Sequence, residues 1–165
     1  MPDIRHHLGI NAPQAAVHQA LATRAGVAGW WTTTVTGDDE VGGKLAFYFG
    51  GPDPSAVMEI VDLSPDRVEW RCVEGPDEWV DTTLTFELKH NDGAARWPEG
   101  RHPHPDTDAT GETEVMFTHG GWREQVPFMA HCSLKWAQFL LSLKAGFEGG
   151  DLIPFPNDPP ISSWG

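Results

Sequence analysis

The segment from Val126 to Glu148 constrains the fold most, because it carries the longest helical pattern in the chain. Its large apolar residues recur at spacings of three and four, which places them on one face of a helix. Gly149 and Gly150 follow in the manner of a left-handed helix cap. A helix of about 22 residues is roughly 33 Å long, the width of a small sheet. We therefore expect one long terminal helix that lies across a sheet.

Upstream of this helix the hydrophobic period changes from helical to two, which is typical of strands. Short turns rich in Gly, Pro and Asp separate the alternating segments, and strands joined in this way form antiparallel sheet. We expect an α+β fold in which a curved antiparallel sheet of six to seven strands wraps around the long C-terminal helix. The predicted strands cover residues 4–10, 32–36, 44–49, 56–63, 67–73, 79–88 and 112–119.

A shorter helix is predicted after the first strand. Asn11-Ala12-Pro13 places a capping residue before a proline in the first turn, which is the preferred way to begin a helix. Apolar residues from Ala16 to Leu21 keep helical spacing, and Gly26 and Gly29 are predicted to break the helix. Trp30 and Trp31 follow: either they stand at the mouth of a cavity, or one packs into the core and the other caps it.

Residues 90–111 have loop composition throughout, and a loop of this length is either functional or a tolerated surface excursion. Its His102 and His104 invite a metal-binding interpretation, but they lack the Cys or carboxylate companions of a zinc site. We therefore predict no metal and no other cofactor. Trp97 in this loop and Trp79 are candidates for a protein-contact surface, because aromatic anchors dominate such interfaces.

We place the domain boundary at residue 150. Residues 1–150 are interpreted as one domain, since a chain of 165 residues suits a single hydrophobic core. Residues 151–165 form a proline-rich tail, which Phe155, Ile161 and Trp164 could hold against the surface.

The charge balance excludes some classes of partner. Asp and Glu number 24 against 11 Lys and Arg, which gives a net charge of −13 with His neutral. Such a field repels the phosphates of nucleic acids and anionic lipid surfaces, so we expect no nucleic-acid partner. No apolar run approaches the roughly 20 residues of a membrane span, and residues 1–11 carry no apolar signal region. Cys72 and Cys132 are interpreted as buried thiols of a cytoplasmic protein.

Several segments together resemble one family. They are residues 8–23 (LGINAPQAAVHQALAT), 29–49 (GWWTTTVTGDDEVGGKLAFYF), 58–70 (MEIVDLSPDRVEW), 111–122 (GETEVMFTHGGW) and 136–150 (WAQFLLSLKAGFEGG). In this order they resemble the START-like superfamily of helix-grip proteins, also called SRPBCC. Within it they are most similar to the branch of the activator of the heat-shock-protein-90 ATPase. The resemblance covers residues 4–150. It implies a helix-grip fold, an apolar ligand and, for this branch, a chaperone as protein partner.

A helix across a cupped sheet encloses a volume that is either filled by interdigitating side chains or left open as a ligand cavity. Strand parity and helix face select the side chains that point into this volume. Four of them, Thr82, His119, Cys132 and Ser133, are polar and could orient a ligand. The candidate ligand-binding residues are Phe47, Phe49, Met58, Trp70, Cys72, Thr82, Leu84, Phe86, Phe117, His119, Met129, Cys132, Ser133, Trp136 and Leu140.

Three functions remain open from the sequence. The leading hypothesis is a non-enzymatic domain that binds a small hydrophobic or amphipathic molecule between sheet and helix. The second is a co-chaperone-like interaction module that activates a chaperone ATPase, as the family branch implies. The third is a cavity-based enzyme. It is the least favoured, because the sequence has no phosphate loop or nucleophile motif and His119 has no partner carboxylate within sequence reach.

Overall fold

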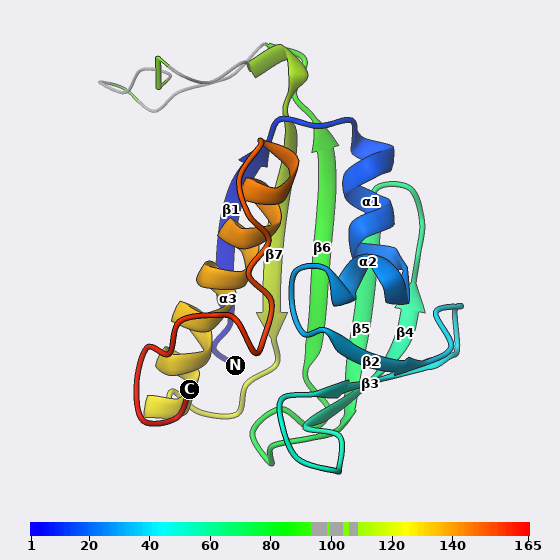
Figure 1. The fold of residues 1–165 in the computed structure, drawn as a ribbon, viewed down its shortest axis with the longest axis vertical. Coiled ribbons are helices and arrows are strands. Elements are labelled where there is room, and N and C mark those ends of the chain that lie inside the picture. The colour runs from blue at the N-terminus through cyan, green and yellow to red at the C-terminus, as the bar shows by residue number, and fades with distance from the viewer. Residues whose placement is uncertain (94–98, 100–103, 106–108) are drawn as a thin grey trace.

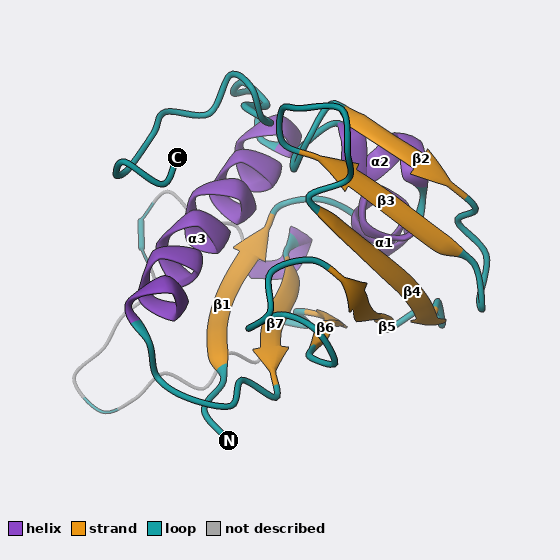
Figure 2. Cartoon of the chain, turned by 90° about the horizontal axis from the view of Figure 1, so that it is seen from below, coloured by secondary structure: helices purple, strands orange, loops and turns teal. Residues whose placement is uncertain are grey.

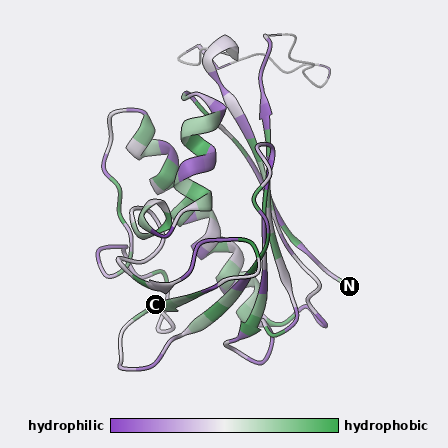
Figure 3. Cartoon of the chain, turned by 90° about the vertical axis from the view of Figure 1, so that its right-hand side faces the viewer, coloured by the Kyte–Doolittle hydropathy of each residue, from purple (hydrophilic) through white to green (hydrophobic). Residues whose placement is uncertain are grey.

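A curved antiparallel sheet and the helices on one of its faces form two layers (Figures 1 and 3). The computed structural model describes residues 1–93, 99, 104, 105 and 109–165, so that Trp97 and His102 lie outside the described residues. The helices are α1 (Gln14–Ala22), α2 (Arg24–Ala28) and α3 (Pro127–Phe147), with a short 3-10 turn, η1 (Ala109–Gly111). The strands are β1 (Ile4–Ile10), β2 (Thr34–Gly37), β3 (Lys44–Tyr48), β4 (Ala56–Asp62), β5 (Arg67–Glu74), β6 (Thr83–His90) and β7 (Thr113–Gly120).

The sheet has the strand order β1-β7-β6-β5-β4-β3-β2, and each neighbouring pair is antiparallel. Strands β2 to β7 form a meander. The first strand joins its far edge by pairing with β7, where Ile4 lies opposite His119 and Ile10 opposite Thr113. Figure 2 shows the sheet curving from β1, which lies beside α3, round to β2 and β3, which lie beside α1 and α2. The predicted α+β fold, a curved antiparallel sheet with a long C-terminal helix, is confirmed.

The sequence of α3 supplies a start, an inward face and an end. Pro127 occupies the first turn, where its missing N–H has no helical partner to lose. Gly149 has a φ of 84°, and Gly150 donates its N–H to the Ala145 carbonyl at 2.8 Å, so the helix stops as predicted. The apolar residues buried by α3 are Met129, Cys132, Trp136, Phe139, Leu140 and Leu143.

The first helical segment is divided differently from the prediction. Instead of one helix that breaks at Gly26, α1 ends at Ala22 and α2 begins after Thr23. The reason is local, because the Thr23 hydroxyl caps α2 by accepting the Gly26 N–H at 3.0 Å. Gly26 lies inside α2 and does not end a helix; it is needed because α1 and α2 pack closely at this position. A Cβ at this position would lie 2.7 Å from the Cα of Ala20.

The start of β6 also differs from the prediction, which placed it at Trp79. A turn occupies residues 76–82, because the N–H groups of Trp79 and Val80 bond to the Pro76 carbonyl at 2.8 and 3.2 Å. Asp81 then adopts a φ of 68°, which continues the turn, and β6 starts at Thr83. Residues 79–82 alternate in type like strand residues, so the predicted strand begins four residues too early, inside the turn.

Trp30 and Trp31 are both buried, and Trp31 also borders the pocket between α3 and the tail. Each is almost completely buried, and the Trp30 indole donates to the Ala20 carbonyl at 3.0 Å. Trp31 packs against Phe47 and Trp70, with ring centroids 4.4 and 6.0 Å away.

Among the described residues, none of the helices is both long enough and apolar enough to cross a membrane.

The C-terminal tail, residues 151–165, packs along one flank of α3 instead of projecting from the domain (Figure 1). Phe155 forms a parallel bridge with Thr32, in which its N–H bonds to the Trp31 carbonyl at 2.9 Å. The Ile153 N–H bonds to the Ser142 hydroxyl at 2.6 Å. These contacts place Phe155 of the tail against the ring of Phe49, which in turn contacts Trp31.

Candidate functional site

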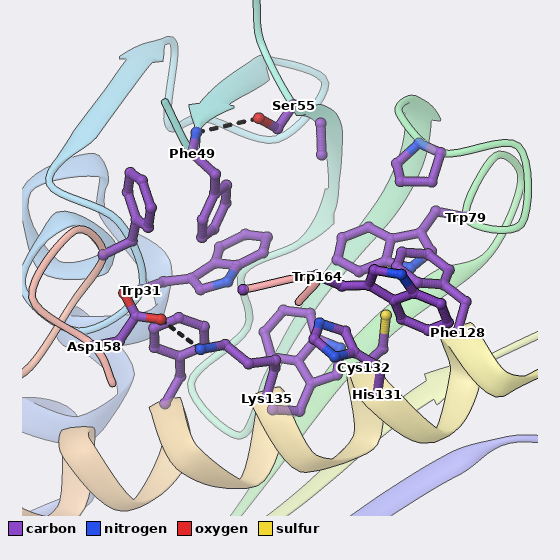
Figure 4. A pocket seen from close by; sticks show the side chains of 16 residues that line it. Trp31, Phe49, Ser55, Trp79, Phe128, His131, Cys132, Lys135, Asp158 and Trp164 are labelled. Carbon is purple, nitrogen blue, oxygen red and sulfur yellow. Dashed lines mark hydrogen bonds and ion pairs between the residues drawn. The ribbon is translucent and has the colours of Figure 1, made fainter. Parts of the chain in front are cut away.

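A pocket of about 380 Å³ lies between α3, the tail and the bent end of the sheet (Figure 4). Its floor is the core around Trp31, its lower wall is α3, and the tail closes its outer side. The turn before β6 and the start of β4 complete it. The lining residues are Trp31, Phe49, Ser55, Ala56, Pro76, Trp79, Phe128, His131, Cys132, Lys135, Trp136, Phe139, Phe155, Asp158, Trp164 and Gly165.

Aromatic rings make up most of the pocket wall. Trp136 from α3 lies between two of them, with ring centroids 4.8 Å from Trp31 and 6.0 Å from Trp79. Phe49 contacts Trp31 at 5.4 Å and Phe155 of the tail at 5.4 Å. These rings contact one another in tilted, stacked and edge-to-face arrangements, so the wall they form is strongly apolar.

One ion pair joins α3 to the tail at the rim of the pocket. The Lys135 ammonium group binds the Asp158 carboxylate and the Gln138 side-chain oxygen, the latter at 2.6 Å. The same ammonium lies 5.0 Å from the centroid of the Phe139 ring. Both charged side chains are mostly buried, at 15% and 7% exposure. The pair therefore fixes the tail as the outer wall and leaves this part of the rim close to neutral.

One buried indole N–H in the pocket wall has only a weak partner. Trp79 Nε1 is enclosed and makes no well-aligned hydrogen bond to a described residue; the described group it acts on is the Cys132 thiol, whose pKa burial raises and this N–H lowers by less. The Cys132 sulfur lies on the same side of the pocket (Figure 4), but sulfur is a weak acceptor. Burial raises the pKa of the Cys132 thiol to about 12, so it remains a neutral thiol. In this structure the N–H has essentially no surface open to the pocket, so a ligand oxygen could replace the weak sulfur acceptor only if the side chains around Trp79 moved.

His119 lies behind the pocket in a closed hydrogen-bond network. Its Nδ1 accepts the Trp136 indole N–H at 3.2 Å, and its Nε2 lies 2.8 Å from the Thr82 hydroxyl, which itself donates to the Trp79 carbonyl at 2.6 Å. This arrangement requires a neutral ring with its proton on Nε2. Burial lowers the His119 pKa to about 3, in agreement with that protonation state. The imidazole therefore holds Trp79 and Trp136 in place.

The structure brings three of the predicted site residues to the pocket wall, namely Phe49, Cys132 and Trp136. Most of the others are buried in the core between sheet and helix, as strand parity indicates, but do not line this pocket. These are Phe47, Met58, Trp70, Cys72, Thr82, Leu84, Phe86, Phe117, His119, Met129 and Leu140. Ser133 points toward β1 instead, where its carbonyl and hydroxyl lie 2.9 and 3.3 Å from His6 Nε2.

The prediction from sequence missed the contribution of the tail and of the flank of α3. Phe155, Asp158 and Trp164 come from a proline-rich segment without periodicity, so no pattern assigned them to a face. Lys135 carried a weak signal, because a lysine within an otherwise apolar stretch of helix needs a partner. Trp79 was predicted as a protein-contact residue, and the structure places it in the pocket wall.

Comparison with known proteins supports this architecture. No family model and no curated protein sequence matches the chain. Among solved structures, the chain is similar to the solution structure of the Aha1 dimer from Colwellia psychrerythraea, with 33% identity and a TM-score of 0.71. The match covers 91% of this chain and 98% of that one. The chain belongs to the Aha1-like family. The family resemblance of the sequence is thereby confirmed.

More distant structures share the fold of this Aha1-like chain. A protein from Staphylococcus saprophyticus matches with 16% identity over 92% of this chain and 96% of its own, at a TM-score of 0.65. CalU16 from Micromonospora echinospora matches with 18% identity over 96% of this chain and 77% of its own, at a TM-score of 0.64. At these identities the similarity concerns the helix-grip fold.

Proposed function

We propose that the pocket between α3 and the tail binds a small hydrophobic or amphipathic molecule. The observation that supports this most is an unfilled volume with a mainly aromatic wall, beside which the Trp79 N–H has only a sulfur as its acceptor. A volume of about 380 Å³ suits a small ligand, since small-molecule sites span roughly 300–1,000 Å³. Burial of the ligand's apolar body supplies affinity, and an oxygen that accepts the indole N–H fixes its orientation.

The charges around the pocket favour an uncharged ligand. Cys132 is a neutral thiol, and Lys135 is already paired with Asp158. A ligand carboxylate would have to displace Asp158 or lose its hydration without compensation, which is unfavourable. The net charge of −13 adds a long-range repulsion of anions. We therefore expect neutral molecules with one carbonyl, ether or hydroxyl oxygen.

Native mass spectrometry of freshly purified protein tests whether a small apolar molecule copurifies with the chain. Fluorescence titration with N-phenyl-1-naphthylamine, a neutral aromatic probe, should give a micromolar Kd, on the order of −8 kcal/mol. Cys132→Phe should abolish binding because the ring fills the pocket. Val61→Phe adds a ring on the exposed face of β4 and should leave binding unchanged. Absence of wild-type binding to this probe and to a panel of neutral apolar molecules would refute the proposal.

The role of Trp79 can be separated from that of the apolar wall. Trp79→Phe keeps an aromatic ring but removes the N–H. It should weaken binding of prodan, a naphthalene that carries a ketone oxygen, by about tenfold, as expected for one lost hydrogen bond. Binding of N-phenyl-1-naphthylamine should change much less. Equal losses for both probes would show that Trp79 acts only through its apolar surface.

Membership in the Aha1-like family favours a second candidate function, namely the chaperone-ATPase activation that the sequence resemblance implies. The measurement is the ATPase rate of an isolated chaperone with and without this chain, together with co-purification of the two proteins. A raised rate that persists in the Cys132→Phe variant would separate this activity from ligand binding.

A further inference from the structure

Residues 161–165 of the tail form a compact turn, the tail turn, which closes one end of the ligand pocket. The N–H groups of Ile161 and Ser162 bond to the Gly165 carbonyl at 2.8 and 3.3 Å, and the Gly165 N–H bonds to the Ser162 carbonyl at 3.1 Å. Trp164 and Gly165 line the pocket, and Trp164 lies beside His131 of α3 (Figure 4). The tail turn is therefore a folded unit of its own at the edge of the pocket.

His131 is at the centre of the contacts between the tail turn and α3. The Ser162 hydroxyl lies 3.1 Å from His131 Nδ1, and its oxygen accepts the Trp164 backbone N–H at 3.1 Å. This leaves the hydroxyl proton to bond to Nδ1 of a neutral imidazole. The same imidazole stacks on Phe128, with ring centroids 6.1 Å apart, and meets the edge of the Trp164 indole at 5.6 Å. One neutral histidine thus contacts both the backbone turn and its aromatic ring.

The first half of the tail is fixed by contacts that do not involve His131. The Phe155 N–H bonds to the Trp31 carbonyl at 2.9 Å, and the Asp158 carboxylate is bound by Lys135. These contacts lie on the other side of the pocket from the tail turn (Figure 4). The tail turn can therefore leave α3 while the first half of the tail keeps its place.

Protonation of His131 opposes its contact with the tail turn. An imidazolium has no acceptor nitrogen, so Nδ1 can no longer accept the proton of the serine hydroxyl. Burial lowers the pKa of His131, and the Lys135 ammonium, one turn further along α3, lowers it more. Lys135 itself is paired with Asp158. Burial, and to a smaller extent Glu78 of the turn before β6, raises the pKa of the adjacent Cys132, but no described carboxylate contributes to that of His131.

The consequence for the tail turn depends on pH. With the turn closed the pKa of His131 is lowered, whereas with the turn open the ring is more exposed and its pKa returns toward the ordinary value of 6.5. Well above that value the ring is neutral in both arrangements, and the closed one keeps its contacts. As the pH falls through it, the open arrangement binds the proton more tightly, so acid shifts the population toward the open turn.

We propose that His131 is a pH-sensitive latch on the ligand pocket. Its neutral ring holds the tail turn closed, and its protonation in mild acid releases the turn. The purpose of the latch rests on the proposed ligand site, because an open turn lets the bound molecule leave. The protein then holds its ligand at neutral pH and releases it faster in mild acid.

The dissociation rate of N-phenyl-1-naphthylamine, which stays neutral in mild acid, tests the latch in stopped-flow. In the wild type the rate should rise by about threefold or more between about pH 7.5 and pH 5.5. His131→Asn places an acceptor oxygen near the position of Nδ1 but cannot titrate, so it should keep the rate of neutral pH and lose the rise. His7→Asn changes an exposed histidine of β1 and should behave like the wild type. All three proteins retain His119, so its acid effect is common to them.

A measurement without ligand keeps the latch separate from the ligand site. In protein labelled with 5-fluorotryptophan, the fluorine resonance of Trp164, assigned with Trp164→Phe, should move toward that of a free indole as the pH falls. The same resonance should stay in place in His131→Asn. Equal pH dependence of the dissociation rate or of this resonance in the wild type and His131→Asn overturns the latch. Failure of the probe to bind at neutral pH, with the fluorine result as expected, would instead overturn the ligand site and leave the latch standing.

Discussion

Mild acid should destabilise this fold through His119. Burial holds the pKa of the folded-state imidazole at about 3, whereas an exposed histidine in the unfolded chain titrates near 6.5. Above that upper value His119 is neutral in both states and its protonation has no effect on stability. As the pH falls below 6.5, the unfolded chain binds a proton at His119, whereas the buried imidazole of the folded chain stays neutral. The free energy of unfolding therefore decreases from pH 6.5 down to about 3.

The magnitude follows from the separation of the two pKa values. Each pH unit in this window lowers the free energy of unfolding by about 1.4 kcal/mol, so that pH 5 costs about 2 kcal/mol relative to neutral pH. Urea titrations at the two pH values measure the difference. His119→Gln is the matched control, because an amide can accept the Trp136 N–H and donate to the Thr82 hydroxyl but cannot titrate.

Comparison of the two proteins removes the contribution of all other titrating groups, which are present in both. His131, whose pKa is lowered by burial and by Lys135, is among them. The wild type should lose about 2 kcal/mol more than His119→Gln between neutral pH and pH 5. An equal loss in both proteins would refute the reasoning, since it would mean that His119 is accessible to protons in the folded state.

Three further substitutions test the packing. Trp136→Ala should cost roughly 3 kcal/mol, the low end for a buried aromatic residue because one side borders the pocket, and a loss under about 1 kcal/mol by denaturant titration would contradict its place in the wall. Gly26→Ala should lower stability by about 1–3 kcal/mol, because the new Cβ meets the Ala20 backbone; an unchanged Tm would show that α1 and α2 can separate. Asp158→Asn should loosen the tail, speed probe association in stopped-flow and lower stability by about 3 kcal/mol, because it leaves the mostly buried Lys135 ammonium without its counter-charge; unchanged rates would mean that the tail does not limit entry.

The fold could be predicted from the sequence because its signals are local. The change of period before α3, the proline at its start and the glycines at its end each follow from neighbouring residues, and each agrees with the structure. Boundaries were less accurate where a turn imitates alternation. Trp79 and Val80 alternate like strand residues, but the Pro76 carbonyl draws both N–H groups into a turn.

The pocket could not be placed in the same way. Strand parity indicates which face a side chain occupies, and Phe47, Trp70 and Phe117 are indeed buried on the inner face. Parity does not indicate depth along the strand, so core and pocket wall look alike in the sequence. The pocket lies where Phe155 and Trp164 return to α3, and that return depends on tertiary contacts of a segment without a period.

The tail forms the outer wall of the ligand pocket. Trp164 and His131 line the pocket, and the Ser162 hydroxyl lies 3.1 Å from His131 Nδ1. A ligand can leave the pocket on that side only if this part of the tail moves, so the contacts that hold the tail against α3 should set the exit rate. We therefore expect Ser162→Ala to raise the dissociation rate of N-phenyl-1-naphthylamine in stopped-flow, because it removes the hydroxyl that faces His131. Ser163→Ala, which changes a neighbouring exposed residue, should leave the rate unchanged. Equal rates in the wild type and Ser162→Ala would show that the tail does not control the exit.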